Sequence, residues 1–291
     1  MAELESQQLL STPIISIRDV RCRGTCKHRS SEECVSALHL VFPYRGFFMR
    51  HIGQREFVAE PDQLLFFNPD EPYRVSHPVA GGDACLSISL DDEIFPELAW
   101  GEGSNHPSKS KSREQQRRID PRAQALLAIL RYSFRNQIIG MVEAETLALT
   151  LIRRSLGKTP SLHLKANQNL QKLVGRAKLA LSANSARNWS LTEIGKEVGV
   201  SPVYLTQVFQ KVEGIPLYRY LTRMRLIRAL DHLGDAKDLT ALALDLGFSS
   251  HSHFSSAFKK SFGTSPSEFR RSMGAVPESF AKNTKELDSS I

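Results

Sequence analysis

The sequence has few cysteines and tryptophans, and it has no long apolar run. Only four of its 291 residues are cysteines and only two are tryptophans. It lacks the run of about eighteen apolar residues that marks a membrane-spanning helix. Residues 1–10 combine neither a basic start nor an apolar stretch, so we expect no secretion signal. These absences predict a cytoplasmic protein that contacts no membrane and forms no disulfides.

The four cysteines all lie in the N-terminal half of the chain. Cys22, Cys26 and Cys34, together with His28, offer three thiols and one imidazole, which are ligand types of a tetrahedral zinc site. Their spacing matches no standard zinc finger. We therefore expect these three cysteines and Cys85 to be unbound thiols, with no metal site and no cofactor. Thiol-based redox sensing and metal binding are kept as alternatives.

Two segments in the C-terminal half share one pattern. When Gly199 and Gly247 are aligned, the residues upstream fall into matching classes, so one face of each expected first helix is apolar. The matching apolar residues are Leu191, Ile194 and Val198 in Leu191–Pro216, and Leu239, Leu242 and Leu246 in Leu239–Pro266. The repeat indicates one small helical unit built twice.

Each segment continues with a second helix that has start and stop signals. Ser201 and Ser250 stand at the expected N-caps, where a serine oxygen accepts a hydrogen bond from the first helical turn. Gly214 and Gly263, each followed closely by proline, end these helices. Helix, glycine turn and capped helix together predict helix-turn-helix units over residues 190–211 and 239–262.

Between the two units, Leu217–Leu233 is predicted to be one continuous helix that fixes their spacing. Arg219, Arg223 and Arg228 lie off its apolar stripe. That stripe consists of Leu217, Leu221, Met224, Ile227, Leu230 and Leu233.

Positive charge is concentrated in this helical region. Residues 165–271 hold sixteen Lys and Arg against eight Asp and Glu, a net charge of +8, whereas the whole chain carries +7. The rest of the chain is therefore about neutral. Positive charge beside helix-turn-helix units is typical of proteins that bind the DNA phosphate backbone.

Residues 169–272 resemble the DNA-binding domain of the AraC/XylS family of bacterial transcription regulators. The most specific stretch is ALDLGFSSHSHFSSAFKKSFGTSPSEFRR, from Ala243 to Arg271. The resemblance implies seven helices, with two recognition helices entering successive major-groove segments. Gly195 departs from the alanine that is commoner in the family, and the short polar Ser255 and Ser256 are a second departure.

The resemblance also implies which side chains face DNA. Side chains in the first half of each recognition helix are expected to contact bases, because glutamine can bond adenine and apolar groups can meet the thymine methyl. Exposed basic residues are expected to contact phosphates. The expected base contacts are Pro202, Val203, Thr206, Gln207, His251, Ser252, His253 and Ser256, and the expected phosphate contacts are Lys211, Lys259, Lys260 and Arg271.

The N-terminal half has short β-favouring runs separated by turn residues, which suggests a small barrel or sandwich. The runs are Ala37–Phe42, Phe47–Ile52, Gln63–Phe67 and Cys85–Leu90. This arrangement resembles the cupin-like sensing half of the same family. Enzymatic cupins bind a metal through a closely spaced histidine pair, and no such pair lies in these runs. A small-molecule pocket is preferred, with Phe48, Arg50, Tyr73, Arg74 and His77 as its expected lining.

The expected fold class is α+β with two domains, a cupin-like β-barrel with flanking helices and an all-α DNA-binding domain. Amphipathic helices are expected over Pro121–Arg135 and Met141–Leu156, either to form a dimer, as in the resembled family, or only to cap the barrel. The expected first domain, for sensing and dimerisation, covers residues 1–157 and consists of a β part over 14–100, a linker over 101–120 and helices over 121–156. A linker over 158–168 joins it to the DNA-binding domain over 169–272, and a flexible tail follows over 273–291.

These observations predict a DNA-binding transcription regulator that is not an enzyme. Its expected partners are double-stranded DNA, RNA polymerase, a small-molecule effector and a second copy of the chain. The alternative is a DNA-repair or cupin enzyme fused to the same DNA-binding module. A repair enzyme of this kind would need a reactive cysteine beside a basic or histidine neighbour.

Overall fold

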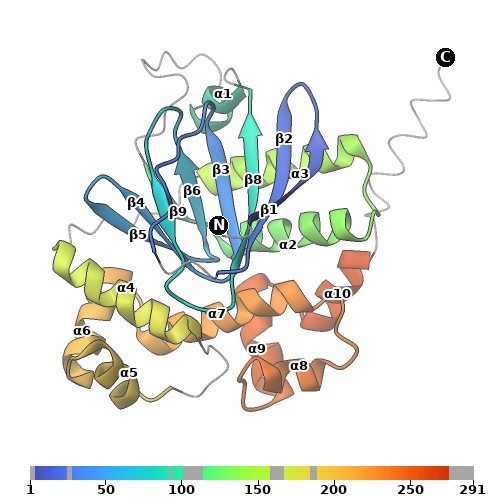
Figure 1. The fold of residues 1–291 in the computed structure, drawn as a ribbon. Helices are drawn as coiled ribbons and strands as arrows, with labels where there is room; N and C mark the ends of the chain where they lie inside the picture. Colours follow the sequence, from blue (N-terminus) through green and yellow to red (C-terminus); the bar gives the residue numbers. More distant parts are fainter. Residues whose placement is uncertain are drawn as a thin grey trace, which may run out of the picture.

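The computed structural model describes residues 4–24, 28–91, 94–100, 114–157, 167–183 and 189–274. Cys26, most of the expected linkers and nearly all of the expected tail lie outside these residues. A β-sheet region forms the N-terminal part and a set of helices forms the C-terminal part (Figure 1). The chain is thus a mixed α and β structure with its helix-turn-helix units at the C-terminal end.

The larger sheet has six antiparallel strands in the order β1-β2-β8-β3-β6-β9. The smaller sheet has three, in the order β5-β4-β7. The strands of the larger sheet are β1 (Leu4–Ser11), β2 (Ile15–Cys22), β3 (His39–Arg45), β6 (Gln63–Phe67), β8 (Asp83–Leu90) and β9 (Gln116–Arg118). Those of the smaller sheet are β4 (Phe48–Ile52), β5 (Arg55–Ala59) and β7 (Arg74–Ser76).

The expected closed barrel is not found among the described residues. The larger sheet ends at β1 and β9, and the smaller sheet ends at β5 and β7, with no ladder joining the two. Two strands also lie outside the predicted boundaries: β1 precedes residue 14, and β9 falls inside the expected linker over 101–120. The sequence of β9 is polar and gives no strand signal. These residues form a strand because they pair with β6.

Both faces of the larger sheet are covered, which explains why all five residues of β6 are buried. Leu64 and Phe66 pack in the core against the helices, whereas Leu65 and Phe67 pack in the core on the other face with Phe48 of the smaller sheet. Alternate side chains of a strand point to opposite faces. An apolar run without alternation therefore marks a strand buried on both sides.

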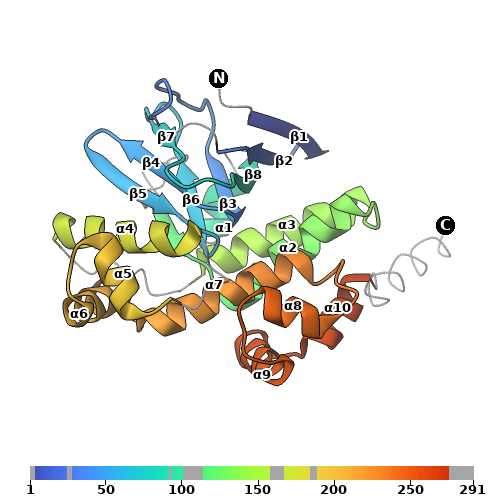
Figure 2. The same cartoon turned by 60° about the horizontal axis from the view of Figure 1, so that its bottom comes forward.

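Helix α1 (Ile94–Trp100) lies between β8 and β9 in the chain, and α2 (Pro121–Arg135) and α3 (Met141–Leu156) follow β9 with the predicted bounds. Asp120 caps α2 by accepting a hydrogen bond from the Ala123 N–H at 2.7 Å. Both helices cover one face of the larger sheet (Figures 1 and 2). Among the described helices, none is long and apolar enough to cross a membrane.

The C-terminal region has seven described helices, as the resemblance implied. They are α4 (Gln168–Ala183), α5 (Leu191–Val198), α6 (Pro202–Glu213), α7 (Leu217–His232), α8 (Leu239–Asp245), α9 (His251–Phe262) and α10 (Pro266–Gly274). One core joins α4, α5, α6 and α7, and a second joins α7, α8, α9 and α10. The predicted connector, α7, belongs to both cores and so holds the two units together.

The two helix-turn-helix turns are built alike. The Val200 N–H donates to the Gly195 carbonyl at 2.9 Å, and the Phe248 N–H donates to the Ala243 carbonyl at the same distance. Gly199 lies in the left-handed region at φ 76°, which favours glycine. The repeat seen in the sequence is therefore confirmed as a repeat of backbone hydrogen bonds.

Two packing details differ from the predicted pattern. Leu191, expected on the apolar face, is 43% exposed at the start of α5. Helix α2 also contributes Ala128 to the core of the second helix-turn-helix unit, together with the partly buried Ala125, Ile129 and Tyr132. The N-terminal and C-terminal regions thus share a core, so α2 is covered on both sides.

Candidate nucleic-acid interface

Helix α6 is fixed to the body of the protein by one face and presents the other to solvent. The Ser201 hydroxyl caps it by accepting from the Tyr204 N–H at 3.2 Å. Leu205 and Phe209 are fully buried, whereas Val203 is 69% exposed. The exposed half of α6 is therefore a rigid surface that can enter a DNA groove.

The four expected base contacts on α6 differ in what they can offer. Val203 and Gln207 are exposed, and Pro202 is half-buried. The Thr206 hydroxyl donates to the Pro202 carbonyl at 2.9 Å, which leaves its methyl group as the group for contact with a base. The exposed Tyr204 was not among the predicted contacts, although its place between Val203 and Leu205 in a capped helix could have indicated it.

Helix α9 is held in the same way. The Ser250 hydroxyl accepts from the His253 N–H at 3.1 Å, and Phe254 and Phe258 are fully buried. The His253 ring lies edge-on to Phe248, with 5.4 Å between centroids, and its Nδ1 is 3.1 Å from the Ser249 hydroxyl. This imidazole is exposed yet held in place.

The other expected base contacts on α9 lie along the same helix. Ser252 and Ser256 are exposed, and His251 is half-buried. The Nε2 atom of His251 is 3.3 Å from the Ser255 hydroxyl. The short Ser255 side chain therefore holds a neighbouring ring instead of reaching outward.

The four expected phosphate contacts, Lys211, Lys259, Lys260 and Arg271, are all exposed. Other basic residues nearby stabilise the fold, because Arg225 donates to the Gly247 carbonyl and Arg270 to the Ala236 carbonyl, each at 2.7 Å. Tyr218, at the start of α7, is 63% exposed and was not predicted as a surface feature.

Helix α7 sets the spacing of the two recognition helices. Helix α6 lies near the first end of α7, and α9 lies toward its other end, both below the larger sheet in the view of Figure 1. Since α7 packs in both cores, neither unit can turn without disturbing the other. The arrangement presents two reading elements on one side of the molecule.

The five residues expected to line an effector pocket lie in and beside the smaller sheet. Arg50 is 1% exposed; it donates to the Phe66 carbonyl at 2.8 Å and stacks on the Phe67 ring at 3.9 Å. Burial lowers its pKa to about 10. Phe48 and His77 are buried, Tyr73 is half-buried and Arg74 is exposed. None of the five lines the cavity described next.

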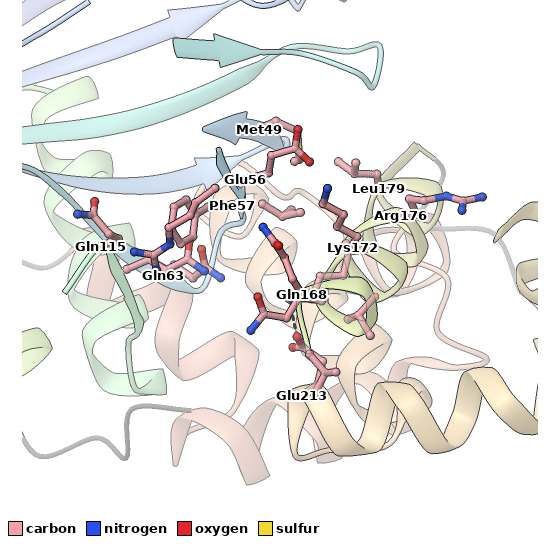
Figure 3. Close-up of a pocket in the computed structure, with 18 of the residues that line it drawn as sticks. Met49, Glu56, Phe57, Gln63, Gln115, Gln168, Lys172, Arg176, Leu179 and Glu213 are labelled. Atoms are coloured by element: carbon pink, nitrogen blue, oxygen red, sulfur yellow. Dashed lines mark ion pairs between the residues drawn. The ribbon is translucent and has the colours of Figure 1, made fainter. Parts of the chain in front are cut away.

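A cavity of about 670 Å³ lies between the sheets and α4 (Figure 3). Met49, Phe57 and Leu179 give it apolar walls. Lys172 of α4 points toward β5, where Glu56 and Phe57 lie. The cavity is thus formed jointly by the N-terminal region and the first helix of the C-terminal region. The sequence did not indicate it, because its walls are far apart along the chain.

A buried set of charged groups lies beside this cavity, here called the junction cluster. It comprises Glu60, Asp62, Arg118, Lys178, Glu213, Tyr220 and Arg223. The Lys178 Nζ lies 2.5 Å from Glu60 Oε1 and 2.8 Å from Glu213 Oε1, and Arg223 lies 2.9 Å from Asp62. Tyr220 donates to Glu60 at 2.7 Å. Three carboxyl groups face three cations, and burial raises the pKa of one of these carboxyls, Asp62.

The pKa shifts in the junction cluster follow from burial and pairing. Burial alone would lower the pKa of Lys178, but Glu60 and Glu213 hold it above its ordinary value. Burial alone would raise the pKa of Glu60, and Lys178 with Arg118 keeps it below its ordinary value. These two side chains are therefore ionised at neutral pH and stabilise each other across the junction.

Comparison with known proteins agrees with this geometry. A family model described as a helix-turn-helix domain matches residues 194–272. The virulence regulon transcriptional activator VirF of Yersinia enterocolitica is 28% identical over 147 residues, which are 50% of this chain and 53% of VirF. The HTH-type transcriptional regulator ArgR of Pseudomonas aeruginosa is 31% identical over 145 residues, 49% of this chain and 44% of ArgR. The chain spans about half the length of these curated relatives.

Two solved structures are also similar to parts of this chain. An AraC-type regulator from Chromobacterium violaceum is 32% identical, and the match covers 38% of this chain and 99% of that chain, with a TM-score of 0.35. ToxT from Vibrio cholerae is 12% identical, covering 91% of this chain and 100% of ToxT, with a TM-score of 0.36. The matched helix-turn-helix region coincides with α5–α10. Residues 194–272 are thus a helix-turn-helix domain, in a chain that is similar over this region to AraC-type transcription regulators.

Proposed function

We propose that this protein binds a specific double-stranded DNA site through α6 and α9 and regulates transcription from it. The observation that carries the proposal is the pair of capped recognition helices, each with a buried aromatic face and an exposed polar face, held together by α7. Two such helices suit two segments of the major groove about one helical turn apart. Recruitment of RNA polymerase is part of the same proposal.

The residues proposed to contact bases are those of the exposed faces. On α6 they are Pro202, Val203, Thr206 and Gln207, and on α9 they are His251, Ser252, His253 and Ser256. Lys211, Lys259, Lys260 and Arg271 are proposed to contact phosphates, which supplies affinity but little sequence preference.

The N-terminal region, a pair of open sheets with flanking helices, is proposed to bind a small-molecule effector. The cavity between the sheets and α4 is the better-supported site, because a ligand there would contact both regions of the protein at once. Lys172 and Arg176 on its lining favour an anionic ligand. Such a ligand would shift the position of α4 relative to β5 and thereby alter DNA binding. The expected division at residues 158–168 is proposed as the boundary between sensing and DNA-binding regions.

Dimerisation is proposed through the start of α3 rather than through α2. Met141 is 63% exposed and Val142 is 79% exposed, whereas α2 is covered by the sheet on one side and by α7, α9 and α10 on the other. Large apolar side chains exposed side by side are typical of contact surfaces.

Footprinting of the full-length chain on a DNA site selected from random sequence tests the main proposal. We expect two protected stretches on one face of the duplex, separated by about one helical turn of 10–10.5 base pairs. A single protected stretch, or protection without any sequence preference, would contradict it. The enzymatic alternative is tested separately by assaying the same preparation for methyl transfer from alkylated DNA, and transfer would favour that alternative.

A further inference from the structure

Three metal-ligating side chains meet inside the N-terminal region, well away from the DNA-binding helices. Cys22, His77 and Asp83 are each at most 6% exposed. The Cys22 Sγ is 3.9 Å from His77 Nδ1, and His77 Nε2 is 3.0 Å from Asp83 Oδ2. One ligand atom from each of the three lies within 4.8 Å of the others.

The backbone holds these three residues firmly. Cys22 and Asp83 face each other directly across the β2–β8 ladder, and His77 follows β7. The loops carrying them are in close contact, since a Cβ placed on Gly82 would lie 2.3 Å from the Cys22 carbonyl oxygen. Gly82 is also left-handed, at φ 72°. Only glycine fits there, so the loop geometry that brings the three side chains together is built into the chain.

Two further contacts favour a metal ion over simple packing. The Gly24 N–H donates to the Cys22 Sγ at 3.4 Å, and hydrogen bonds of this kind stabilise a thiolate ligand. The Asp83 Oδ2 atom is buried and makes no hydrogen bond of good geometry in the described part of the chain, although it lies 3.0 Å from the Nε2 atom of His77. The Asp83 carboxylate and the His77 imidazole therefore lie close enough to be ligands of one ion.

We propose that Cys22, His77 and Asp83 form a binding site for a divalent transition metal ion of the zinc class. Thiolate, imidazole and carboxylate are all zinc ligands, and their bond lengths of about 2.0–2.3 Å place ligand atoms about 3.3–3.7 Å apart in a tetrahedron. His77 would bind the ion through one ring nitrogen, and one ligand atom from each of the three residues lies within 4.8 Å of the others, so adjustments of about 1 Å suffice. Water would occupy the fourth position.

Charge balance supports the same choice. On binding, the Cys22 thiol releases its proton to solvent, and the thiolate with the Asp83 carboxylate supplies two negative charges. A divalent cation cancels them, so the buried site becomes neutral with histidine uncharged. The sequence-based expectation of no metal site rested on Cys26, His28 and Cys34, and the folded chain instead brings His77 and Asp83 to Cys22.

Titration of the metal-free, full-length chain with Co²⁺ tests the site, because cobalt bound to a thiolate shows a sulfur-to-metal charge-transfer band. We expect about one equivalent to bind and zinc to displace it. Cys22→Ser should abolish the band, and Asp83→Asn and His77→Gln should weaken binding at least about tenfold. The matched controls are Cys34→Ser, which is exposed, and Cys85→Ala, which lies buried in the core between the sheets.

A second readout is independent of the cobalt spectrum. Zinc should raise the melting temperature of the wild-type chain and leave that of Cys22→Ser unchanged, with circular dichroism showing that both are folded. A wild-type chain with no cobalt band, or a Cys22→Ser chain that keeps the band, would overturn the proposal. The three residues would then form only a hydrogen-bonded structural cluster.

Discussion

Lys178 of α4 forms an ion pair of 2.5 Å with Glu60, which lies 118 residues earlier in the turn between β5 and β6. Lys178 is 7% exposed and Glu60 is fully buried. The pair joins the helix that leads into the first helix-turn-helix unit to the sheet region. It is therefore one of the contacts of the junction cluster by which a change in one region can reach the other.

Removing this lysine should destabilise the protein strongly. In Lys178→Met, Glu60 and Glu213 remain buried without their shared cation, so we expect the free energy of unfolding to fall by about 3–5 kcal/mol in urea titrations. Adding Glu60→Gln should recover part of the loss. The control is Arg135→Ala, whose pair with Asp235 is 45% and 60% exposed, and which should cost less than about 1 kcal/mol. A Lys178→Met chain as stable as this control would contradict a stabilising role of Lys178 in the junction cluster.

The N-terminal cap of α10 should make the stability of the protein depend on pH in the acid range. Hydrogen bonds from the Ser265 N–H, the Ser265 hydroxyl and the Thr264 hydroxyl lower the pKa of Glu268 to about 2. A lowered carboxyl pKa contributes stability above the unfolded pKa of about 4.3, and that stability is lost as the pH falls through the folded pKa. The difference in stability between wild type and Glu268→Gln should therefore shrink between about pH 4.3 and 2. A difference that stays constant across this range, measured by chemical unfolding at each pH, would argue against the cap.

A charge at the start of α3 should weaken self-association. Val142 is 79% exposed beside Met141, so Val142→Glu would place a carboxylate in the proposed apolar contact. We expect sedimentation to show a dimer for the wild type and a larger monomer fraction for this variant. Thr150→Glu, an exposed position on the same helix, is the matched control and should remain dimeric. Equal association of all three chains would exclude this surface.

A phosphate contact should act on all DNA sequences alike. Lys259→Gln should weaken binding to specific and unrelated DNA by the same factor and lower the slope of log affinity against log salt by about one. Arg18→Gln, which is exposed on β2 and hydrogen-bonded to Gln8 of β1, should change neither. A loss confined to one sequence would instead make Lys259 a base contact.

The helices could be predicted from the sequence because their signals are local. Ser201, Ser250 and the turn glycines act within a few residues, and α2, α3 and the connector were placed almost to the residue. The junction cluster could not be predicted, because Glu60 and Lys178 meet only through the packing of the whole chain. The same holds for Cys22, because Asp83 comes from another strand and His77 from the segment after β7. The residues of β9 were predicted to be part of a linker for a related reason, because they form a strand only by pairing with β6.

Selection of binding sites from random DNA with wild-type, Gln207→Ala and Gln210→Ala chains tests direct reading by α6. Gln207 is exposed on the face proposed to meet the groove, whereas the Gln210 amide donates to the Gly214 carbonyl at the end of the helix. We expect the wild type to enrich a motif with two segments. Gln207→Ala should lose preference at one base pair and about 1–3 kcal/mol of affinity for the wild-type site, while Gln210→Ala keeps the motif. No enriched motif for the wild type, or an unchanged motif for Gln207→Ala, would contradict sequence reading by this helix.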